Sequence, residues 1–147
     1  MSEMRVYVLV RHGHAMDAPA FKGPSRERPL TERGHEQARA LAALLAGERI
    51  TAVYASPALR CQQTAEHLAK AFGLTMEIRQ GLLEGRMIAL DQHESGSVLV
   101  AHGDNIPALL AELRVKCHEL DTACAWRVEL TAEGTVNAAV YIRHDGH

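Results

Sequence analysis

Aromatic residues are scarce in this chain: they make up 4% of its 147 residues, whereas hydrophobic residues as a whole make up 47%. We therefore expect a core of aliphatic side chains, packed closely between elements rather than around a few large rings. A chain of this length buries about 68–70% of the surface that its unfolded form exposes, which is enough to fold without cross-links. Residues 1–147 are accordingly predicted to form a single domain.

An excess of one charge sign is also missing, since 16 lysines and arginines face 18 aspartates and glutamates. Without a basic field, we expect neither nucleic acid nor an anionic membrane as a partner. No apolar run approaches the length that spans a membrane, and the first ten residues carry Glu3 and Arg5, unlike a signal peptide. These absences predict a cytoplasmic protein.

Cysteines are few and odd in number, and Cys61, Cys117 and Cys124 form no C-x-x-C pair. This pattern favours reduced, mostly buried thiols over disulfides. Cys117, His118 and Cys124 offer zinc-binding side chains, but their spacing matches no recognised zinc motif.

Strand patterns alternate with helical ones along most of the chain. Val6–Val10 and Ser97–Ala101 are continuous apolar runs, which predicts strands buried on both faces, as in a parallel sheet. Shorter strands are predicted at 50–55 and 74–79. The proline-containing segment from Ala18 to Leu30 is predicted to be a loop.

Helices are predicted where a capping residue precedes a run of helical period. Thr31 is expected to cap the first, and Ser56, followed by a first-turn proline, the second. Asp104 or Asn105 is expected to cap the third. These helices cover about 32–46, 57–72 and 105–114, and a short fourth helix is placed around Met87–His93 in the otherwise undecided stretch 80–96.

The end of the chain has a different pattern. Ala125–Leu130 and Val136–Arg143 flank a short polar segment with a glycine, which predicts an antiparallel hairpin. The fold class is therefore α/β: a three-layer sandwich with a mostly parallel central sheet flanked by helices, and a C-terminal antiparallel hairpin at one side.

Two of the predicted strands end in the same way, with His12-Gly13 after the first and His102-Gly103 after the other. Ligands of open α/β sheets bind beyond the carboxyl ends of the strands. Both histidines are therefore expected on the functional edge, and they meet if their strands are neighbours. The glycines allow a ligand to approach the backbone closely.

Two arginines are expected at the same edge. Arg11 precedes the first histidine, and Arg60 lies in the first turn of a helix, where side chains lean back toward the helix N-terminus. Arginine donates bidentate hydrogen bonds to phosphate and stays charged, and a helix N-terminus itself favours anions. Phosphate is thus the predicted ligand.

These residues resemble the motifs of the histidine phosphatase (phosphoglycerate mutase-like) superfamily, and their order along residues 5 to about 105 is the same. The chain is short and similar in this respect to the SixA-type phosphohistidine phosphatases. The motifs that carry the resemblance are Arg11-His12-Gly13, Arg28-Pro29-Leu30-Thr31-x-x-Gly34, Ser56-Pro57-x-x-Arg60-x-x-Gln63-Thr64-Ala65 and the strand-end His102.

The resemblance implies that His12 attacks phosphorus and forms a phosphohistidine, which water then hydrolyses. It implies that Arg11, Arg60 and His102, with Gly13 beside them, bind the phosphoryl oxygens. The substrate would be phosphohistidine in a partner protein or a small phosphate ester. This mechanism needs no metal and no cofactor.

The family's general acid is often the glutamate of a Leu-x-Glu string, and Glu84 matches that position in Leu82-Leu83-Glu84. An ordinary surface carboxylate is the alternative. His14 departs from the family, which commonly has an acidic or amide side chain there. Arg28 could reach the phosphate or form a loop salt bridge.

The remaining histidines are assigned no function. Three of them are expected on exposed helix faces: His35, His67 and His93. The other three have no partner that the sequence identifies: His118, His144 and His147. Two other classes of protein stay open: a relay module that accepts phosphoryl on His12 without turnover, and a metal-binding protein that uses some of the nine histidines.

Overall fold

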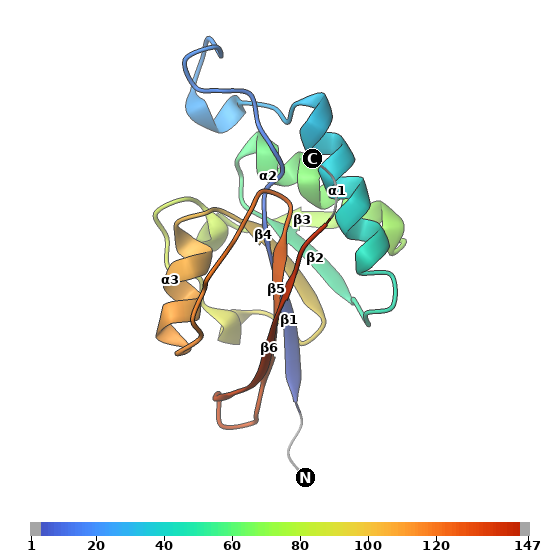
Figure 1. Cartoon of the computed structure of the whole chain (residues 1–147), viewed down its shortest axis with the longest axis vertical. Helices are drawn as coiled ribbons and strands as arrows, with labels where there is room; N and C mark the ends of the chain where they lie inside the picture. Colours follow the sequence, from blue (N-terminus) through green and yellow to red (C-terminus); the bar gives the residue numbers. More distant parts are fainter. Residues whose placement is uncertain (1–3, 145–147) are drawn as a thin grey trace.

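The computed structural model describes residues 4–144, and its centre is a six-stranded sheet with the order β3-β2-β4-β1-β5-β6. Parallel pairing joins β3 to β2, β2 to β4 and β4 to β1, whereas β5 pairs antiparallel with β1 on one side and with β6 on the other (Figure 1). The expected sheet and its terminal hairpin are confirmed. The strands are β1 (Arg5–Arg11), β2 (Ala52–Ala55), β3 (Met76–Ile78), β4 (Ser97–Ala101), β5 (Ala125–Leu130) and β6 (Val136–Ile142).

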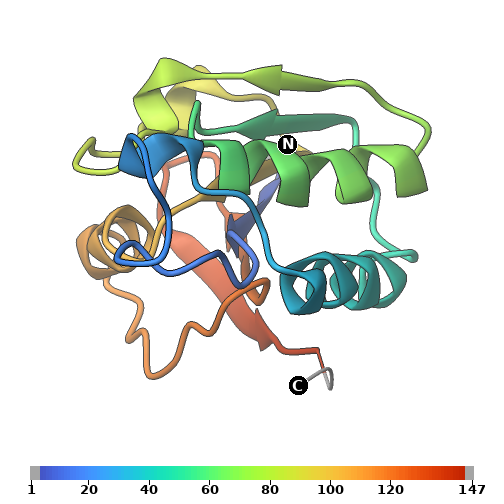
Figure 2. The same cartoon turned by 90° about the horizontal axis from the view of Figure 1, so that it is seen from above.

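Helices cover both faces of this sheet, which gives the predicted three layers. The helices α1 (Glu32–Leu44) and α2 (Leu59–Ala71) pack side by side on one face, and α3 (Asn105–Glu112) lies on the other (Figure 2). Three short 3-10 helices, η1 (Ser25–Glu27), η2 (Gln80–Leu82) and η3 (Leu90–Gln92), lie in the connections.

The alternation of side chains along β1 divides the core into two. Val8 and Val10 pack with Leu41 of α1 and Leu68 of α2, whereas Tyr7 and Leu9 belong to the cluster on the α3 side. All four of these β1 side chains are fully buried. The continuous apolar run therefore forms a strand that is covered on both faces, as its composition predicted.

The helix starts agree with the predictions for α1 and α3 and differ for α2, where the expected capping side chain is engaged elsewhere. Thr31 caps α1 as expected, since its hydroxyl accepts from the backbone N–H of Gly34 over 3.1 Å. The N-cap of α2 is Ala58 rather than Ser56, whose hydroxyl contacts the ring of His102. Asp104 occupies the N-cap of α3, but its carboxylate accepts from Gly85 instead.

The other helix ends and the stretch 80–96 also needed correction. The first helix ends at Leu44 and the third at Glu112, each two residues earlier than expected. The short helix expected around 87–93 is the single 3-10 turn η3, because Ala89 and His93 on either side of it have extended backbone.

The cysteines are free thiols, buried at Cys61 and Cys124 and half-buried at Cys117. Within residues 4–144 no cluster of three metal-ligating side chains is present. None of the helices there is long and apolar enough to cross a membrane.

Candidate active site

His12 and His102 lie side by side at the carboxyl ends of the neighbouring strands β1 and β4. Arg11 is in register with Ala101, and the backbone N–H of His12 donates to the carbonyl of Ala101 over 3.1 Å. The two ring centroids are 5.7 Å apart with an angle of 67° between the ring planes. The sheet topology thus brings together two histidines that are 90 positions apart in the sequence.

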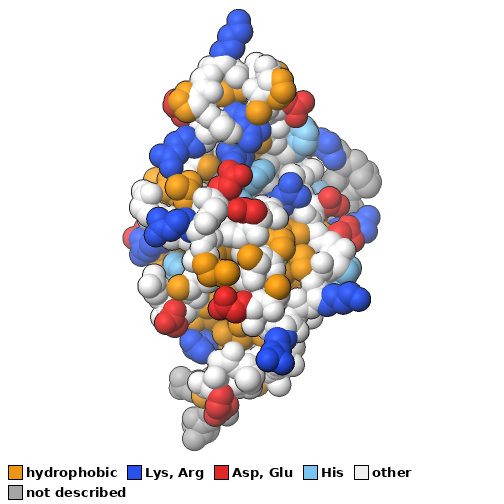
Figure 3. All heavy atoms as spheres, turned by 90° about the vertical axis from the view of Figure 1, so that its left-hand side faces the viewer, with side chains coloured by type: hydrophobic (Ala, Val, Ile, Leu, Met, Phe, Trp, Pro, Cys, Tyr) orange, Lys and Arg blue, Asp and Glu red, His pale blue; other side chains and the backbone are white. Residues whose placement is uncertain are grey.

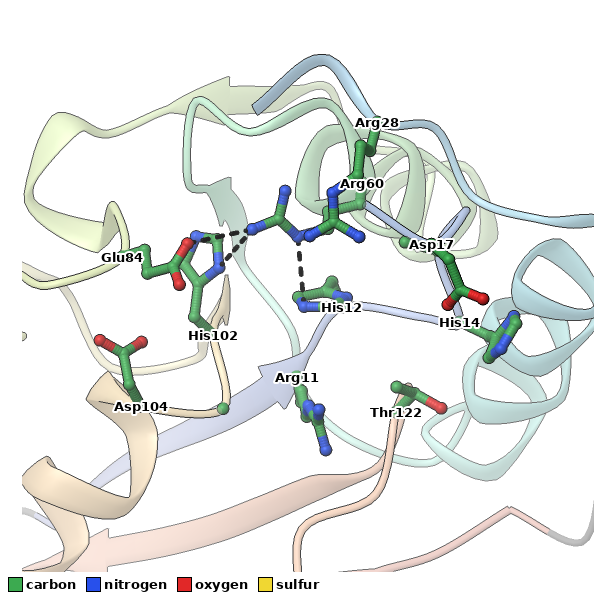
Figure 4. A pocket seen from close by; sticks show the side chains of 12 residues that line it. Arg11, His12, His14, Asp17, Arg28, Arg60, Glu84, His102, Asp104 and Thr122 are labelled. Atoms are coloured by element: carbon green, nitrogen blue, oxygen red, sulfur yellow. Dashed lines mark hydrogen bonds and ion pairs between the residues drawn. The ribbon is translucent and has the colours of Figure 1, made fainter. Parts of the chain in front are cut away.

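The ring of His12 is held in one tautomer. Its Nδ1 lies 2.8 Å from the carbonyl oxygen of Gly13, and Nε of Arg60 donates to its Nε2 over 3.3 Å (Figure 4). A carbonyl only accepts and a guanidinium only donates, so Nδ1 carries the proton and Nε2 presents a lone pair. Nε2 is therefore the nucleophilic atom of this ring.

The surroundings of His12 keep its imidazole neutral. Burial lowers its pKa to about 3; the carbonyl of Gly13 opposes this shift, and the positive charges of Arg60 and Arg11 reinforce it. Burial and the charge of Arg60 likewise lower the pKa of His102 to about 4. At neutral pH both rings are uncharged, and an uncharged imidazole is the form that attacks an electrophile.

Arg60 contacts both histidines and Glu84, and only 3% of its surface is exposed. Besides its bond to His12, Nη2 donates to the Glu84 carboxylate over 3.2 Å and lies 3.5 Å from Nδ1 of His102. Nη1 donates to the carbonyl of Ser25 over 3.2 Å. One guanidinium thereby connects both strand-end histidines with the exposed carboxylate of Glu84.

Arg11 reaches the site from the end of β1. Its Nη1 donates to the carbonyl of Leu120 over 2.8 Å, while its Nε is buried and has no partner among the described residues. A Cβ at Gly103 would lie 3.0 Å from that Nε. The glycine after His102 therefore leaves room for the side chain of Arg11.

The turn after His12 packs closely against the first turn of α1. A Cβ at Gly13 would lie 2.8 Å from the carbonyl oxygen of Gly34, and a Cβ at Gly34 would overlap the carbonyl oxygen of His14. The N–H of Gly13 donates to the hydroxyl of Thr64 over 2.9 Å. Gly13 is thus required for packing, and its N–H does not face the pocket as a phosphate ligand would.

The side chains of this edge enclose a pocket of about 460 Å³ in which both charge signs are present. The face in Figure 3 also shows basic, acidic and histidine side chains interspersed rather than a field of one sign. The pocket is lined by Arg11, His12, His14, Ala15, Asp17, Arg28, Arg60, Glu84, His102, Gly103, Asp104 and Thr122.

His14 and Arg28 lie at the pocket, anchored by neutral groups. Nδ1 of His14 is 2.8 Å from the Thr31 hydroxyl. Arg28 donates to the carbonyl of Met16 over 2.7 Å and to the hydroxyl of Ser25 over 3.1 Å. Of the two alternatives for Arg28, the structure therefore favours the pocket rim over a loop salt bridge.

Two supporting residues were not anticipated as parts of the site. The carboxamide of Asn105 accepts from the backbone N–H of His102 over 3.0 Å and donates to the carbonyls of Leu82 and Leu83. It therefore ties the loop that carries Glu84 to the end of β4. The hydroxyl of Ser56 contacts the ring of His102. From the sequence, the Ser-Pro pattern predicted only the start of a helix.

Three other histidines are less exposed than expected, and a fourth, for which no exposure was predicted, is buried. His35 and His67 are half-buried, with Nδ1 of the first 2.9 Å from Nε2 of the second. His93 follows a 3-10 turn and is half-buried beside Tyr54. His144 is buried with its Nε2 2.9 Å from the carbonyl of Thr122.

His118 is exposed and lies edge-on to Trp126 and Tyr141. His147 is outside the described residues.

Known proteins with similar sequences match parts of this chain. The 8-oxo-(d)GTP phosphatase of Mycolicibacterium smegmatis is 43% identical over 68 residues, covering 46% of this chain and 21% of that protein. A probable phosphoglycerate mutase of Yersinia pestis, GpmB, is 40% identical over 94 residues, covering 58% of this chain and 43% of GpmB. The matches span less than half the length of these relatives.

Solved structures match over nearly the whole chain, with low sequence identity. The protein histidine phosphatase SixA complexed with tungstate has a TM-score of 0.78 at 24% identity, covering 92% of this chain and 96% of SixA. A mycobacterial glucosyl-3-phosphoglycerate phosphatase has a TM-score of 0.68 at 17% identity, covering 99% and 100% of the two chains. The chain therefore shares its fold with these phosphatases.

Structural likeness at such low sequence identity shows the fold alone, whereas a match to a family model shows to which family the chain belongs. The model for the histidine phosphatase superfamily, branch 1, matches residues 7–93, a range that includes His12, Arg60 and Glu84 and ends before His102. Since this range is more than half of the chain, the protein belongs to the histidine phosphatase superfamily.

Proposed function

We propose that this protein is a phosphatase that takes the phosphoryl group of its substrate onto Nε2 of His12 and hydrolyses the resulting phosphohistidine. The observation that carries this proposal is the state of that nitrogen: it is unprotonated, held by the Nδ1 contact to Gly13 and directed at Arg60. Membership of a phosphatase superfamily supports the same chemistry.

In the first step the lone pair of Nε2 attacks phosphorus in line. The P–N bond forms while the bond from phosphorus to the leaving atom breaks, and the leaving atom keeps that electron pair. In the second step water attacks phosphorus, the P–N bond breaks and Nε2 regains its lone pair. The attacking water gives its proton to a phosphoryl oxygen, and inorganic phosphate leaves. We assign Glu84 to the first step alone, as the acid that would protonate the leaving atom of an ester.

The transition states spread negative charge over the phosphoryl oxygens, and the donors around His12 are placed to stabilise it. We assign this role to Arg11, Arg60 and His102. Arg60 is bonded to Glu84 and His12 in this structure, so phosphate would replace acceptors that already lie on the guanidinium. The buried unpartnered Nε of Arg11 is a further donor for an oxyanion.

As the substrate we propose phosphohistidine in a partner protein of the cytoplasm. Glu84, the candidate acid, accepts a hydrogen bond from Nη2 of Arg60 over 3.2 Å, so this carboxylate oxygen is already engaged by a guanidinium. Phosphohistidine protonated on its ring releases neutral imidazole and needs little help from an acid, whereas an alkyl ester needs a proton donor. The likeness to SixA across nearly the full length of both chains supports the same choice.

A small phosphate ester is the second candidate, because the relatives that match in sequence are a nucleotide phosphatase and a mutase by name. The two candidates are separated by measuring phosphate release from a histidine-phosphorylated protein and from a panel of alkyl phosphates at equal concentration. We expect the highest kcat/KM on phosphohistidine. Faster hydrolysis of an ester would favour the metabolite phosphatase.

The relay module without turnover makes a different prediction in the same experiment. It would take up at most one phosphoryl group per chain and release no inorganic phosphate. Repeated turnover of any substrate, including a generic aryl phosphate, would exclude it.

A further inference from the structure

Arg60, Glu84 and His102 each line two neighbouring hollows of the molecule. One is the active-site pocket that contains His12. The other is a cavity of about 360 Å³, a volume within the range of about 300–1,000 Å³ that is typical of ligand pockets. We call this second hollow the side cavity. Its remaining walls are Pro24, Ser25, Arg26, Ala58 and Leu83.

The side cavity lies on the side to which the leaving group of the proposed reaction departs. In an in-line displacement the leaving atom is opposite the nucleophile, so it points away from Nε2 of His12. Figure 4 shows Glu84 on the far side of the Arg60 guanidinium from His12. A phosphoryl group held by Arg60 at His12 therefore directs the group to which it was attached toward Glu84 and the side cavity beside it.

Both walls of the side cavity are fixed to the active site by hydrogen bonds. The carbonyl of Ser25 accepts from Nη1 of Arg60 over 3.2 Å, and its hydroxyl accepts from Nε of Arg28 over 3.1 Å. On the opposite wall, the carboxamide of Asn105 donates to the carbonyl of Leu83 over 3.1 Å. The side cavity is thus held in place in the resting protein, and a ligand that enters it has little to order.

The walls that belong to the side cavity alone are mostly apolar and carry one charge. Pro24, Ala58 and Leu83 are apolar, which suits the faces of a flat ring such as imidazole. Arg26 is the only charged side chain among these walls, and it is exposed. Within the part of the chain that the structure describes it forms no ion pair, so its guanidinium is available to a carboxylate beside the leaving group.

We propose that the side cavity is the subsite for the leaving group, which takes the imidazole ring of a phosphohistidine between its apolar walls, and that Arg26 selects partner proteins with an acidic side chain next to that residue. This inference rests on the proposed function, because the side cavity receives a leaving group only if His12 takes up the phosphoryl group. Arg26 is a specificity-determining residue in this arrangement and takes no part in the chemical steps.

The test of Arg26 measures kcat/KM on phosphohistidine peptides that differ only in having Glu, Gln or Lys beside the phosphohistidine. Phosphoramidate is the reference substrate, because its leaving group is ammonia and does not fill the side cavity. We expect the wild type to prefer the Glu peptide over the Lys peptide by about 10-fold at low salt, and by less at high salt, which screens exposed charges. Arg26→Glu should reverse this preference and leave phosphoramidate hydrolysis unchanged. Arg39→Glu, the matched charge reversal on α1, should keep the wild-type preference.

Leu83→Ala tests the apolar wall of the side cavity. We expect this variant to raise KM for the Glu peptide by on the order of 10-fold, as loss of contact in a hydrophobic pocket does, without changing phosphoramidate kinetics. Met87→Ala is the matched control, since Met87 is an exposed apolar residue outside the side cavity. It should change neither rate.

Equal rates on the three peptides, or an unchanged preference in Arg26→Glu, would overturn the selection by Arg26. An equal loss on the Glu peptide and phosphoramidate in Leu83→Ala would overturn the subsite. A wild type that turns over neither phosphoramidate nor any peptide would overturn the proposed function and this inference with it, whereas turnover without a peptide preference would overturn this inference alone.

Discussion

Arg60 and His12 are joined by a hydrogen bond from Nε of the guanidinium to Nε2 of the imidazole, 3.3 Å long. This bond aims the lone pair of the nucleophile at the group that would hold the phosphoryl oxygens. Arg60 itself is fixed, since it is buried in the first turn of α2 and bonded on its other side to the carbonyl of Ser25. The guanidinium is thus placed beside His12 before substrate arrives, and a bound phosphoryl group would replace its bond to Nε2 and free the lone pair for attack.

The first prediction concerns the role of His12 as the nucleophile. His12→Ala should abolish turnover, and the wild type should form a phosphoenzyme that is labile in acid and stable in base, as phosphoramidates are. Rapid quenching with a radiolabelled substrate measures both. His67→Ala serves as a control, because this histidine lies outside the pocket. Label on a serine, or an active His12→Ala protein, would contradict the mechanism.

Removal of the oxyanion donors should reduce the rate strongly without unfolding the protein. We expect Arg60→Ala and His102→Ala each to lose on the order of 10²-fold or more in kcat, as the removal of one oxyanion donor does. Steady-state kinetics beside a circular dichroism spectrum measure the effect. Arg39→Ala, on the exposed face of α1, controls for the loss of a positive charge. Losses below about 3-fold would remove these residues from the proposed machinery.

Glu84→Gln should distinguish between leaving groups. An alkoxide is about as basic as hydroxide, whose conjugate acid has a pKa of about 15.7, whereas that of imidazole is about 6.5. The substitution should therefore slow alkyl phosphates by on the order of 10²-fold and phosphohistidine by only a few-fold. An equal loss on both substrates would mean that Glu84 supports Arg60 rather than moving a proton.

Acid should destabilise the fold through the two central histidines. The pKa values of His12 and His102 are lowered by burial to about 3 and about 4, from 6.5. Between the ordinary and the lowered values, the unfolded chain binds protons that the native state does not, so the free energy of unfolding falls as pH drops from about 6.5 toward 4.

Urea unfolding at several pH values measures this dependence. The double variant His12→Ala/His102→Asn should show a shallower fall than the wild type. Parallel curves for the two proteins would mean that these rings are protonated in the native state.

Chelation provides a separate test of the metal-binding alternative. The proposed steps use only side chains and water, so dialysis against a chelator should leave kcat and KM unchanged. Loss of activity that added divalent metal restores would favour a metal-dependent reaction instead.

The sequence predicted the sheet and placed His12 and His102 at one edge of it, because both depend on short-range signals; that the two residues meet depends on β1 and β4 being neighbours. Apolar runs identify β1 and β4, and strand ends place the residues that follow them at one edge. The order of the strands was not predictable from such signals. It depends on which strands pair, and pairing is settled by packing across the whole sheet.

The side-chain hydrogen bonds that the sequence did not predict share one physical cause, even at Asp104, which occupies the N-cap of α3 as expected. Ser56, Asp104 and Asn105 are polar side chains next to helix starts, where local propensity predicts capping. In the folded chain each has a partner from a distant segment: the ring of His102, the N–H of Gly85, and the carbonyls of Leu82 and Leu83. Local propensity carries no information about such partners, and the exposure of His35 and His67 was misjudged for the same reason.

The close packing of Gly13 on Gly34 has a consequence for how this protein tolerates sequence change. Neither position has room for a β-carbon without moving backbone, whereas one at Gly47 or Gly81 would meet nothing within 4 Å. In a library covering every position, substitutions at 13 and 34 should therefore be lost with those at His12, although neither glycine lines the pocket. Depletion at these two sites would reflect backbone geometry, and should not be mistaken for contact with substrate.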